Sequence, residues 1–567
     1  MASPSLILGP PEIYLTTPSS ADLTTPTAGK PESTSSGNSF IDAMVSSFNN
    51  LANKPPMGFT ENFSPTFLSS GNLCLDFFFH VVLDTTPEIL MQRLGLARNH
   101  NALTTLKLVC NLRGVRGTGK SDKEGLYTAG LWLHKNHPKT LAYLPEILYR
   151  LIEGADVRRI KKKEKPIRFR TLWWSYCRSQ IKKIVSMAKK AVERYSCDPE
   201  YRFLHDRVSD VFAELLRADL QFLKSEQYGK ISLAAKWCPS LDSSFDRTIL
   251  VCESIARRVF PRDSYPEYEG IEEAHYAYRI RDRLRKEYLV PHMSANLWNS
   301  LPYNRVASVA MKTYKDHFQK HDKGRFKECL SSVQRGEAKI AAGALLPHEI
   351  IASLYDYDGG QVAELQWQRM VDDLSKNGTL KNCIAVCDVS GSMYGTPMDV
   401  CVALVLLISE LSDEPWKGKV ITFSADPQLQ MIIGDVLRSK TQFIQEMDWG
   451  MNTDFQKVLE QMIKRVFVFG DMEFDEASGN NWVTDYVAIQ RKFKESGYAM
   501  VPEIVFWNLR DSEATPVLSN QRGVALVSGF SKNLVKLFLE NDGVLSPEAV
   551  MELAISGKEY QKLVVLD

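Results

Sequence analysis

The stretch Cys383 to Met393, "CIAVCDVSGSM", decides the fold of the C-terminal third of this chain. Its first five residues are apolar, and a polar, glycine-containing loop follows them directly. A short apolar run that ends this way predicts a buried strand. Four more runs rich in Val, Ile and Phe have the same character: "KVITFS" (419–424), "RVFVFGD" (465–471), "EIVFWNL" (503–509) and "GVALVSGF" (523–530).

Helical stretches separate these apolar runs, for example "DVCVALVLLISELS" and "DYVAIQRKFKESG". Alternation of fully apolar strands with helices predicts a parallel sheet that is covered on both faces. In such open α/β domains the ligand site lies at the carboxyl ends of the strands. We therefore expect an α/β, Rossmann-like domain over residues 378–567, with its site at that edge of the sheet.

The chain before this domain has a different pattern. Apolar residues recur at helical spacing in "TLKLVCNL", "DRVSDVFAELLRADLQFLK" and "FDRTILVCESIARRVF", and strand signals are nearly absent. This pattern predicts an all-α, helical-repeat domain over residues 61–375. Residues 1–60 are rich in Ser, Thr, Pro and Gly and predict a disordered tail, so we expect a multidomain protein.

Composition excludes several classes of protein. The 567 residues carry a net charge of +1, so any nucleic-acid affinity must come from a local patch. No run approaches the ~18–20 apolar residues of a membrane helix, and the start of the chain lacks the basic region of a secretory signal. The ten cysteines lack the spacing that is typical of a disulfide framework, which suggests reduced thiols. We expect an intracellular protein, cytoplasmic or nuclear or both, with no membrane contact.

The loop after the first strand carries oxygen ligands. Asp388, Ser390 and Ser392 place one carboxylate and two hydroxyls at alternate positions. Such hard ligands suit Mg²⁺ or Mn²⁺. Thr453, before a predicted helix, and Asp471, at the end of the strand "VFVFGD", are candidates to complete the set. A second interpretation is that Asp388 and the serines only cap the following helix.

Hydrolysis at this loop is not expected. A phosphatase with an aspartyl nucleophile needs a second acid two residues after the first, to protonate the leaving group. Ser390 occupies that position, and the loop offers no lysine or histidine. We therefore expect no enzyme and no catalytic residue here.

The order Asp388, Ser390, Ser392, Thr453, Asp471 resembles the metal-ion-dependent adhesion site of von Willebrand factor A-like domains. The resemblance covers roughly residues 380–567. It implies that the hydroxyls bind Mg²⁺ directly and that the acids bind it directly or through water. It also implies that a carboxylate from a protein partner completes the shell.

Other segments extend the resemblance to about residues 66–567. The chain is similar to an uncharacterised family, common in plants, whose members join a helical domain of unknown function to a von Willebrand A-like domain. More distantly, the layout is similar to the Ro ribonucleoprotein (TROVE) family, in which HEAT-like repeats bind small structured and misfolded RNAs. The segments that carry this resemblance are "SGNLCLDFFF" (70–79), "VRGTGKSDKEGLYTAGLWLHKNHP" (115–138), "SLAAKWCPS" (232–240), "RVASVAMKTYKDHFQKHDKGRFKECL" (305–330) and "RGEAKIAAGALLPHEII" (335–351).

The chain departs from the family pattern in two places. The segments 288–298 and 453–465 look shorter than their counterparts in the family. The second departure puts the exact docking of Asp471, the second strand-end acid, in doubt.

The segment 114–121, "GVRGTGKS", matches the pattern of a phosphate-binding loop. A working loop needs a strand before it and a partner strand ending in Asp on the same sheet. The preceding "LKLVCNL" has helical spacing instead, so a nucleotide hydrolase using Lys120 is only an alternative function. The cations Arg113, Arg116, Lys120 and Lys123 form either a basic surface turn or a contact for phosphate, including an RNA backbone.

A stronger basic feature lies at residues 158–190, where thirteen Lys or Arg face one Glu and aromatic residues are interleaved. Three interpretations remain open: single-stranded nucleic-acid binding, a solvated face over buried tryptophans, and a nuclear localisation signal in "RRIKKKEK". The residues predicted to bind RNA are Arg158, Arg159, Lys161, Lys162, Lys163, Lys165, Arg168 and Arg170, together with Arg116 and Lys120.

These features together predict a non-enzymatic binding protein. The helical domain would bind structured RNA, and the C-terminal domain would hold Mg²⁺ or Mn²⁺ and contact an acidic protein partner through it. The main alternative is a protein–protein interaction scaffold that does not bind RNA.

Overall fold

The computed structural model describes residues 55–114, 117–142, 186–227, 230–232, 234–239, 246–288, 301, 303–356, 358–388, 391–422, 428–447, 463–474, 484–495, 497–498, 501–539 and 546–567. These residues form two compact units, which we describe separately. Of the described residues, one unit comprises those within Gly130–Leu297 and Leu566–Asp567, and the other comprises those within Thr27–Ala129 and Trp298–Val565. Within the described residues, no helix is long and apolar enough to cross a membrane.

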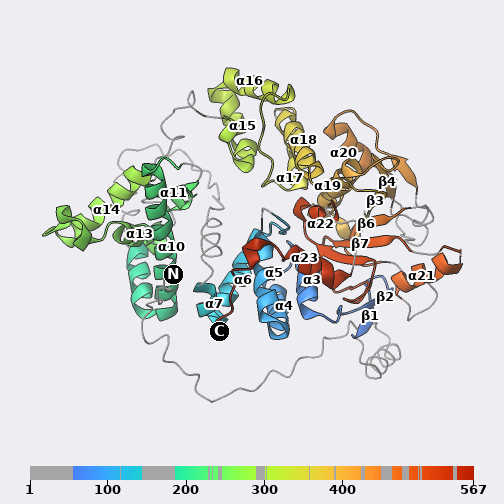
Figure 1. The fold of residues 1–567 in the computed structure, drawn as a ribbon, viewed down its shortest axis with the longest axis horizontal. Coiled ribbons are helices and arrows are strands. Elements are labelled where there is room, and N and C mark those ends of the chain that lie inside the picture. The colour runs from blue at the N-terminus through green and yellow to red at the C-terminus, as the bar shows by residue number, and fades with distance from the viewer. Residues whose placement is uncertain are drawn as a thin grey trace, which may run out of the picture. The chain divides into compact units, whose positions relative to one another are not determined.

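The first unit is helical, as predicted for this part of the chain. Helix α10 (Pro199–Lys224) packs against α13 (Val251–Val259), and α13 packs against α14 (Glu273–Tyr288) (Figure 1). Asp198 caps α10 by accepting a hydrogen bond from the N–H of Tyr201, and Pro199 fits the first helical position. The apolar faces of these helices share one core, which includes Phe212, Leu216, Ile255, Ile280 and Leu284.

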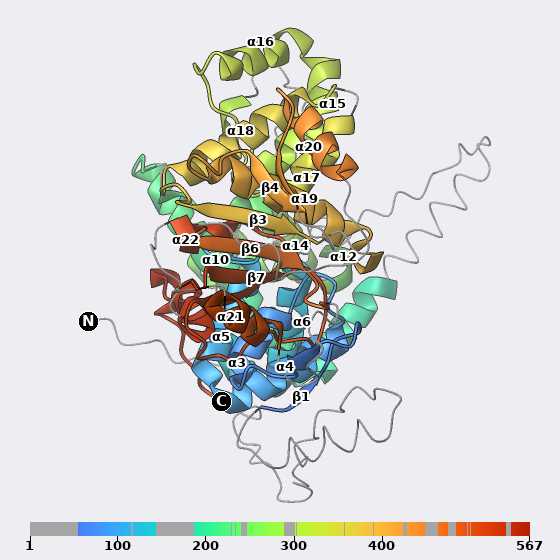
Figure 2. The same ribbon diagram turned by 90° about the vertical axis from the view of Figure 1, so that its right-hand side faces the viewer.

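The second unit contains a six-stranded mixed sheet in the order β5-β4-β3-β6-β7-β8. Figure 2 shows β4, β3, β6 and β7 side by side. All neighbours are parallel except β5, which is an antiparallel edge strand. The five parallel strands coincide with the five apolar runs of the sequence, whereas β5 was not predicted. The strands are β3 (Cys383–Cys387), β4 (Lys419–Thr422), β5 (Leu429–Met431), β6 (Arg465–Gly470), β7 (Glu503–Asn508) and β8 (Val524–Ser528).

Helix α19 (Thr396–Leu411) is almost wholly buried against this sheet. One side contacts β3, β4 and β6, while the other side contacts α17 (Pro347–Ala352), α18 (Gln361–Ser375) and α20 (Leu437–Glu446). An apolar surface on every side of α19 suits this position between two layers. Helix α18 also packs against α15 (Ser308–His321) and α16 (Lys323–Gln334).

The N-terminal segment belongs to the same unit as the sheet. Strands β1 (Met57–Phe59) and β2 (Pro65–Phe67) form a hairpin, and β2 is bridged to Thr515, beyond β7. Helix α3 (Leu73–His80) contacts β8 and α23 (Pro547–Ala554). Strand β1 therefore occupies residues that we had assigned to the disordered tail. Two further helices, α4 (Pro87–His100) and α5 (Ala102–Arg113), pack next to α3.

Candidate metal site at the strand ends

The register of the sheet places two acids that were predicted to be metal ligands at one edge of the sheet. Cys387 pairs with Phe469 in the parallel ladder of β3 and β6, so Asp388 and Asp471 follow the carboxyl ends of adjacent strands. The N–H of Asp388 donates to the carbonyl of Phe469 at 2.8 Å. A Cβ on Gly470 would lie only 2.8 Å from Oδ2 of Asp388, so only glycine leaves room for this carboxylate.

Asp471 has one carboxylate oxygen that nothing in the described chain satisfies. The residue is 1% exposed, and its Oδ1 accepts a hydrogen bond of 3.1 Å from the N–H of Glu473. Its Oδ2 is buried without a hydrogen-bond partner, and Nη1 of Arg510 lies 3.7 Å away. A buried carboxylate oxygen without a donor is costly. A cation placed there would remove that cost, so the residues present fit a metal ion.

The other predicted ligands are only partly described. Ser392 is half-buried and lies in the short helix η8 (Gly391–Met393), between Asp388 and α19. Ser390 and Thr453 lie outside the described residues, as do most of the two segments that look short. Among the described residues, no three His, Cys, Asp or Glu side chains are grouped to hold a metal. The predicted set contains only two acids, and hydroxyls make up the rest.

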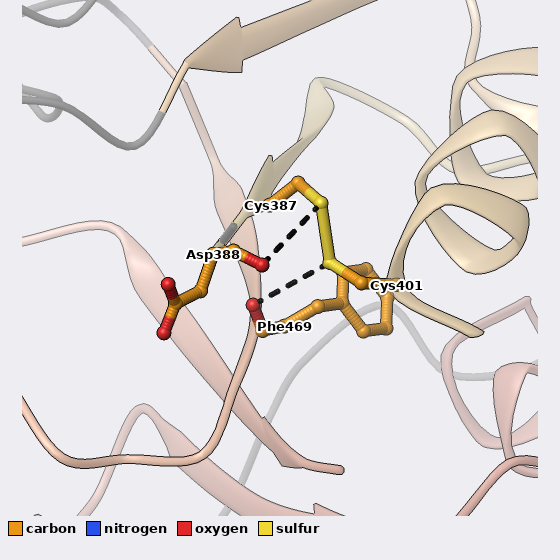
Figure 3. Close-up of a disulfide and its surroundings, with 4 residues drawn as sticks. All are labelled: Cys387, Asp388, Cys401 and Phe469. Carbon is orange, nitrogen blue, oxygen red and sulfur yellow. Dashed lines mark hydrogen bonds between the residues drawn. A yellow bond between two sulfur atoms is a disulfide. The ribbon is translucent and has the colours of Figure 1, made fainter. Parts of the chain in front are cut away.

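A disulfide lies beside this edge of the sheet. It joins Cys387, the last residue of β3, to Cys401 in α19, with the two Cα atoms 6.0 Å apart. Figure 3 shows the carboxylate of Asp388 pointing away from the disulfide. The sulfur of Cys401 lies 3.7 Å from the carbonyl oxygen of Phe469. The expectation of reduced thiols is therefore wrong for this pair. The two cysteines are 14 positions apart in the sequence, and their spacing did not indicate a disulfide.

Glu473 is a third acid at this edge that the sequence did not indicate. Burial, helped by the nearby charge of Asp471, raises the pKa of its carboxyl to about 7. Oε2 of Glu473 accepts a hydrogen bond of 2.6 Å from the N–H of Glu61, and Asn62 donates to the carbonyl of Glu473 at 2.7 Å. The β1–β2 hairpin thus holds the loop after β6. These partners are more than 400 residues apart in the sequence, so no local pattern indicates them.

The segment 114–121 does not have the surroundings of a phosphate-binding loop. Helix α5 precedes it where such a loop needs a strand. Lys120 is 2% exposed, and its Nζ donates to the carbonyls of Phe78 and Val81 and to Oγ of Ser528. Burial lowers the pKa of Lys120 to about 7. The ammonium is therefore out of reach of a nucleotide or an RNA phosphate.

Backbone packing explains the glycines of this segment. A Cβ on Gly119 would overlap the backbone oxygen and Cα of Gly114. Asn533, in the segment after β8, donates to the carbonyls of both glycines, at 3.3 Å and 3.2 Å. The segment therefore serves as a packing contact between α5 and the end of β8.

The predicted RNA-binding residues are largely outside the described chain. Residues 143–185 are not described, nor is the 115–116 pair that contains Arg116. The predictions for this basic run therefore remain predictions. The residues concerned are Arg158, Arg159, Lys161, Lys162, Lys163, Lys165, Arg168 and Arg170.

Two family models cover the chain. The model described as Domain of unknown function (DUF2828) matches residues 60–165 and 175–380. The model described as Domain of unknown function (DUF7788) matches residues 382–563. The chain is also 27% identical over 521 residues to "Uncharacterized protein L728" of Acanthamoeba polyphaga mimivirus, across 85% of this chain and 84% of that protein. No solved structure matches.

Proposed function

The chain belongs to the family described as Domain of unknown function (DUF2828), and we propose that it is a non-enzymatic binding protein that contacts an acidic protein partner through Mg²⁺ or Mn²⁺. The observation that carries this proposal is the unsatisfied, buried Oδ2 of Asp471. It lies at the sheet edge where Asp388 follows the adjacent strand. Ligand sites of open α/β sheets occur at this edge.

Asp388 and Asp471 would hold the ion, together with the hydroxyls of Ser390, Ser392 and Thr453. Two carboxylates balance the charge of a divalent cation, and the neutral hydroxyls leave a coordination position of the kind that Mg²⁺ commonly keeps for water or a ligand. When bound, the ion would supply electrostatic attraction for an oxygen of the partner. The resemblance to von Willebrand A-like domains supports the same ligand order and a carboxylate as the partner's contact.

Calorimetric titration of the full chain with Mn²⁺ tests the site. We expect one site that Asp388→Ala removes. Asp435→Ala is the matched control because it removes the same charge from an exposed residue between β5 and α20. Equal isotherms for the wild type and Asp388→Ala would refute the metal assignment.

RNA binding is a second candidate function, favoured by an exposed face of α15 and α16. The ring of His317 lies 6.2 Å from that of Tyr314 and stacks on that of His321 at 6.3 Å. Exposed lysines lie on the same two helices and form no ion pair with an acid among the described residues. Aromatic faces beside unpaired cations are typical of single-strand binding. The lysines are Lys320, Lys323 and Lys327.

Fluorescence anisotropy of a labelled structured RNA, at two salt concentrations, tests this second function. Changing the three lysines to Glu should weaken binding severalfold and flatten its salt dependence, because fewer counterions are released. The matched control changes three exposed cations of α21 (Asp485–Glu495) to Glu, namely Arg491, Lys492 and Lys494. No binding by the wild type at low salt would favour the alternative of a protein–protein interaction scaffold.

A further inference from the structure

Arg510 lies at the same edge of the sheet as the candidate metal ligands. It follows β7, whose last residue, Asn508, pairs with Gly470 at the end of β6. The N–H of Arg510 donates to Oδ1 of Asn508 at 3.1 Å, and Nδ2 of Asn508 donates to the carbonyl of Phe79 at 3.3 Å. Asn508 is 0% exposed. The backbone of Arg510 is therefore anchored to a buried and well-connected residue.

The guanidinium of Arg510 faces a buried acid on one side and solvent on the other. Its Nη1 lies 3.7 Å from Oδ2 of Asp471, and the side-chain exposures are 37% for Arg510 and 2% for Asp471. That distance is too long for a hydrogen bond but short enough for charge attraction. Arg510 therefore offsets part of the charge of Asp471 without satisfying its oxygen.

A second acid is within reach of the charge of Arg510. Asp84 lies in the connection between α3 and α4. Burial raises the pKa of the Asp84 carboxyl, and the positive charge of Arg510 opposes that rise. The charge of Arg510 therefore acts on an acid of the candidate metal site and also on an acid outside it.

We propose that Arg510 is a resident counter-cation that competes with the divalent metal for Asp471. This inference rests on the proposed metal site. A carboxylate as buried as that of Asp471 needs a positive neighbour in the metal-free protein. Once a divalent ion supplies that charge, repulsion between the two cations drives the guanidinium away from Asp471. Arg510 therefore sets the metal concentration at which the site fills.

Mn²⁺ titration of Arg510→Gln in the full chain tests this role. The variant should bind Mn²⁺ about tenfold more tightly, because one competing charge near the ion is gone. Arg522→Gln is the matched control, since it removes the same charge from an exposed residue just before β8, at the opposite edge of the sheet. The affinity of this control should equal that of the wild type.

Thermal unfolding separates competition from a purely structural role. With a chelator present, Arg510→Gln should melt below the wild type because Asp471 loses its counter-charge. With saturating Mn²⁺, the two melting temperatures should converge.

The possible outcomes distinguish this inference from the proposed function. If the wild type binds Mn²⁺ and Arg510→Gln leaves the affinity unchanged or lowers it, the competition is refuted and the metal site stands. If the wild type does not bind Mn²⁺, both the metal site and the competition are refuted. Tighter binding in Arg510→Gln together with convergent melting temperatures supports both.

Discussion

Two segments of this chain contain glycine and serine and look like ligand-binding loops. They differ in the element that precedes them and in their surroundings. The segment 114–121 follows helix α5, and its lysine points into the protein interior. The segment that begins at Asp388 follows strand β3 at the carboxyl edge of the sheet. The comparison teaches that the preceding element decides whether such a segment is a packing contact or a candidate site.

Lys120, the buried charge of segment 114–121, and Asp471, a buried charge of the candidate metal site, differ in the same way. Three acceptors surround the ammonium of Lys120, from α3, the turn after it and the end of β8. Oδ2 of Asp471 has no donor among the described residues. A buried charge whose hydrogen bonds are complete is accounted for by packing, whereas an incomplete one is a candidate for function.

The largest expected effect tests the packing role of segment 114–121. Gly119→Ala should lower the free energy of unfolding by about 3 kcal/mol, because the new methyl group overlaps the backbone of Gly114. Urea denaturation followed by circular dichroism measures this change. Gly324→Ala is the control, since a Cβ on Gly324 meets nothing within 4 Å. Equal stability of the two variants would contradict the packing role.

The next effect tests the metal-site role of Asp471. At Mn²⁺ concentrations about 100-fold above the dissociation constant, binding should stabilise the wild type by about 2.7 kcal/mol. Asp471→Asn should lose this stabilisation while folding normally without metal, because the amide carries no buried charge. Differential scanning fluorimetry with and without Mn²⁺ measures both quantities. A full Mn²⁺-dependent shift in the variant would show that the ion binds elsewhere.

A smaller effect concerns the pH dependence that Lys120 confers. Its pKa is about 7 in the folded protein and near the ordinary value of 10.5 in the unfolded chain. Between these values the unfolded chain binds the extra proton, so the free energy of unfolding should rise with pH, by about 1–2 kcal/mol from pH 7 to 9. Denaturant titrations across this range should show the rise in the wild type and a flatter profile in Lys120→Met. An identical slope in both proteins would rule out this contribution.

The smallest effect concerns one acceptor of Lys120. Ser528→Ala removes a hydroxyl that lies 2.7 Å from Nζ and donates to the carbonyl of Phe78 at 2.9 Å. The two backbone carbonyls still accept from the ammonium, so the loss should be about 1 kcal/mol. Ser556→Ala, at an exposed serine, is the control for the same denaturation measurement. A loss as large as that of Lys120→Met would show that the hydroxyl, and not the carbonyls, stabilises the ammonium.

The parts of the fold that could be predicted depend on local patterns. Alternating apolar runs predicted the five parallel strands and placed Asp388 and Asp471 at one edge of the sheet. The contacts that the sequence did not reveal join residues far apart in the chain. The β1–β2 hairpin, the burial of Lys120 against Ser528 and the Cys387–Cys401 disulfide are examples. Such contacts form between surfaces that each element buries separately, so no spacing within one element indicates them.

The packing of α3 against β8 and α23 has a consequence for how the protein is made. Phe77, Phe78 and Phe79 are each 1% exposed in the finished fold, where α3 contacts elements from the far end of the chain. At about 5–20 residues per second, a ribosome needs roughly 20–90 s to synthesise the intervening chain. During that time the three phenylalanines lack their contacts with β8 and α23. Their apolar side chains are then available for chaperones that bind the nascent chain. A chain begun at residue 378 lacks α3 altogether and leaves the matching surface of the sheet uncovered.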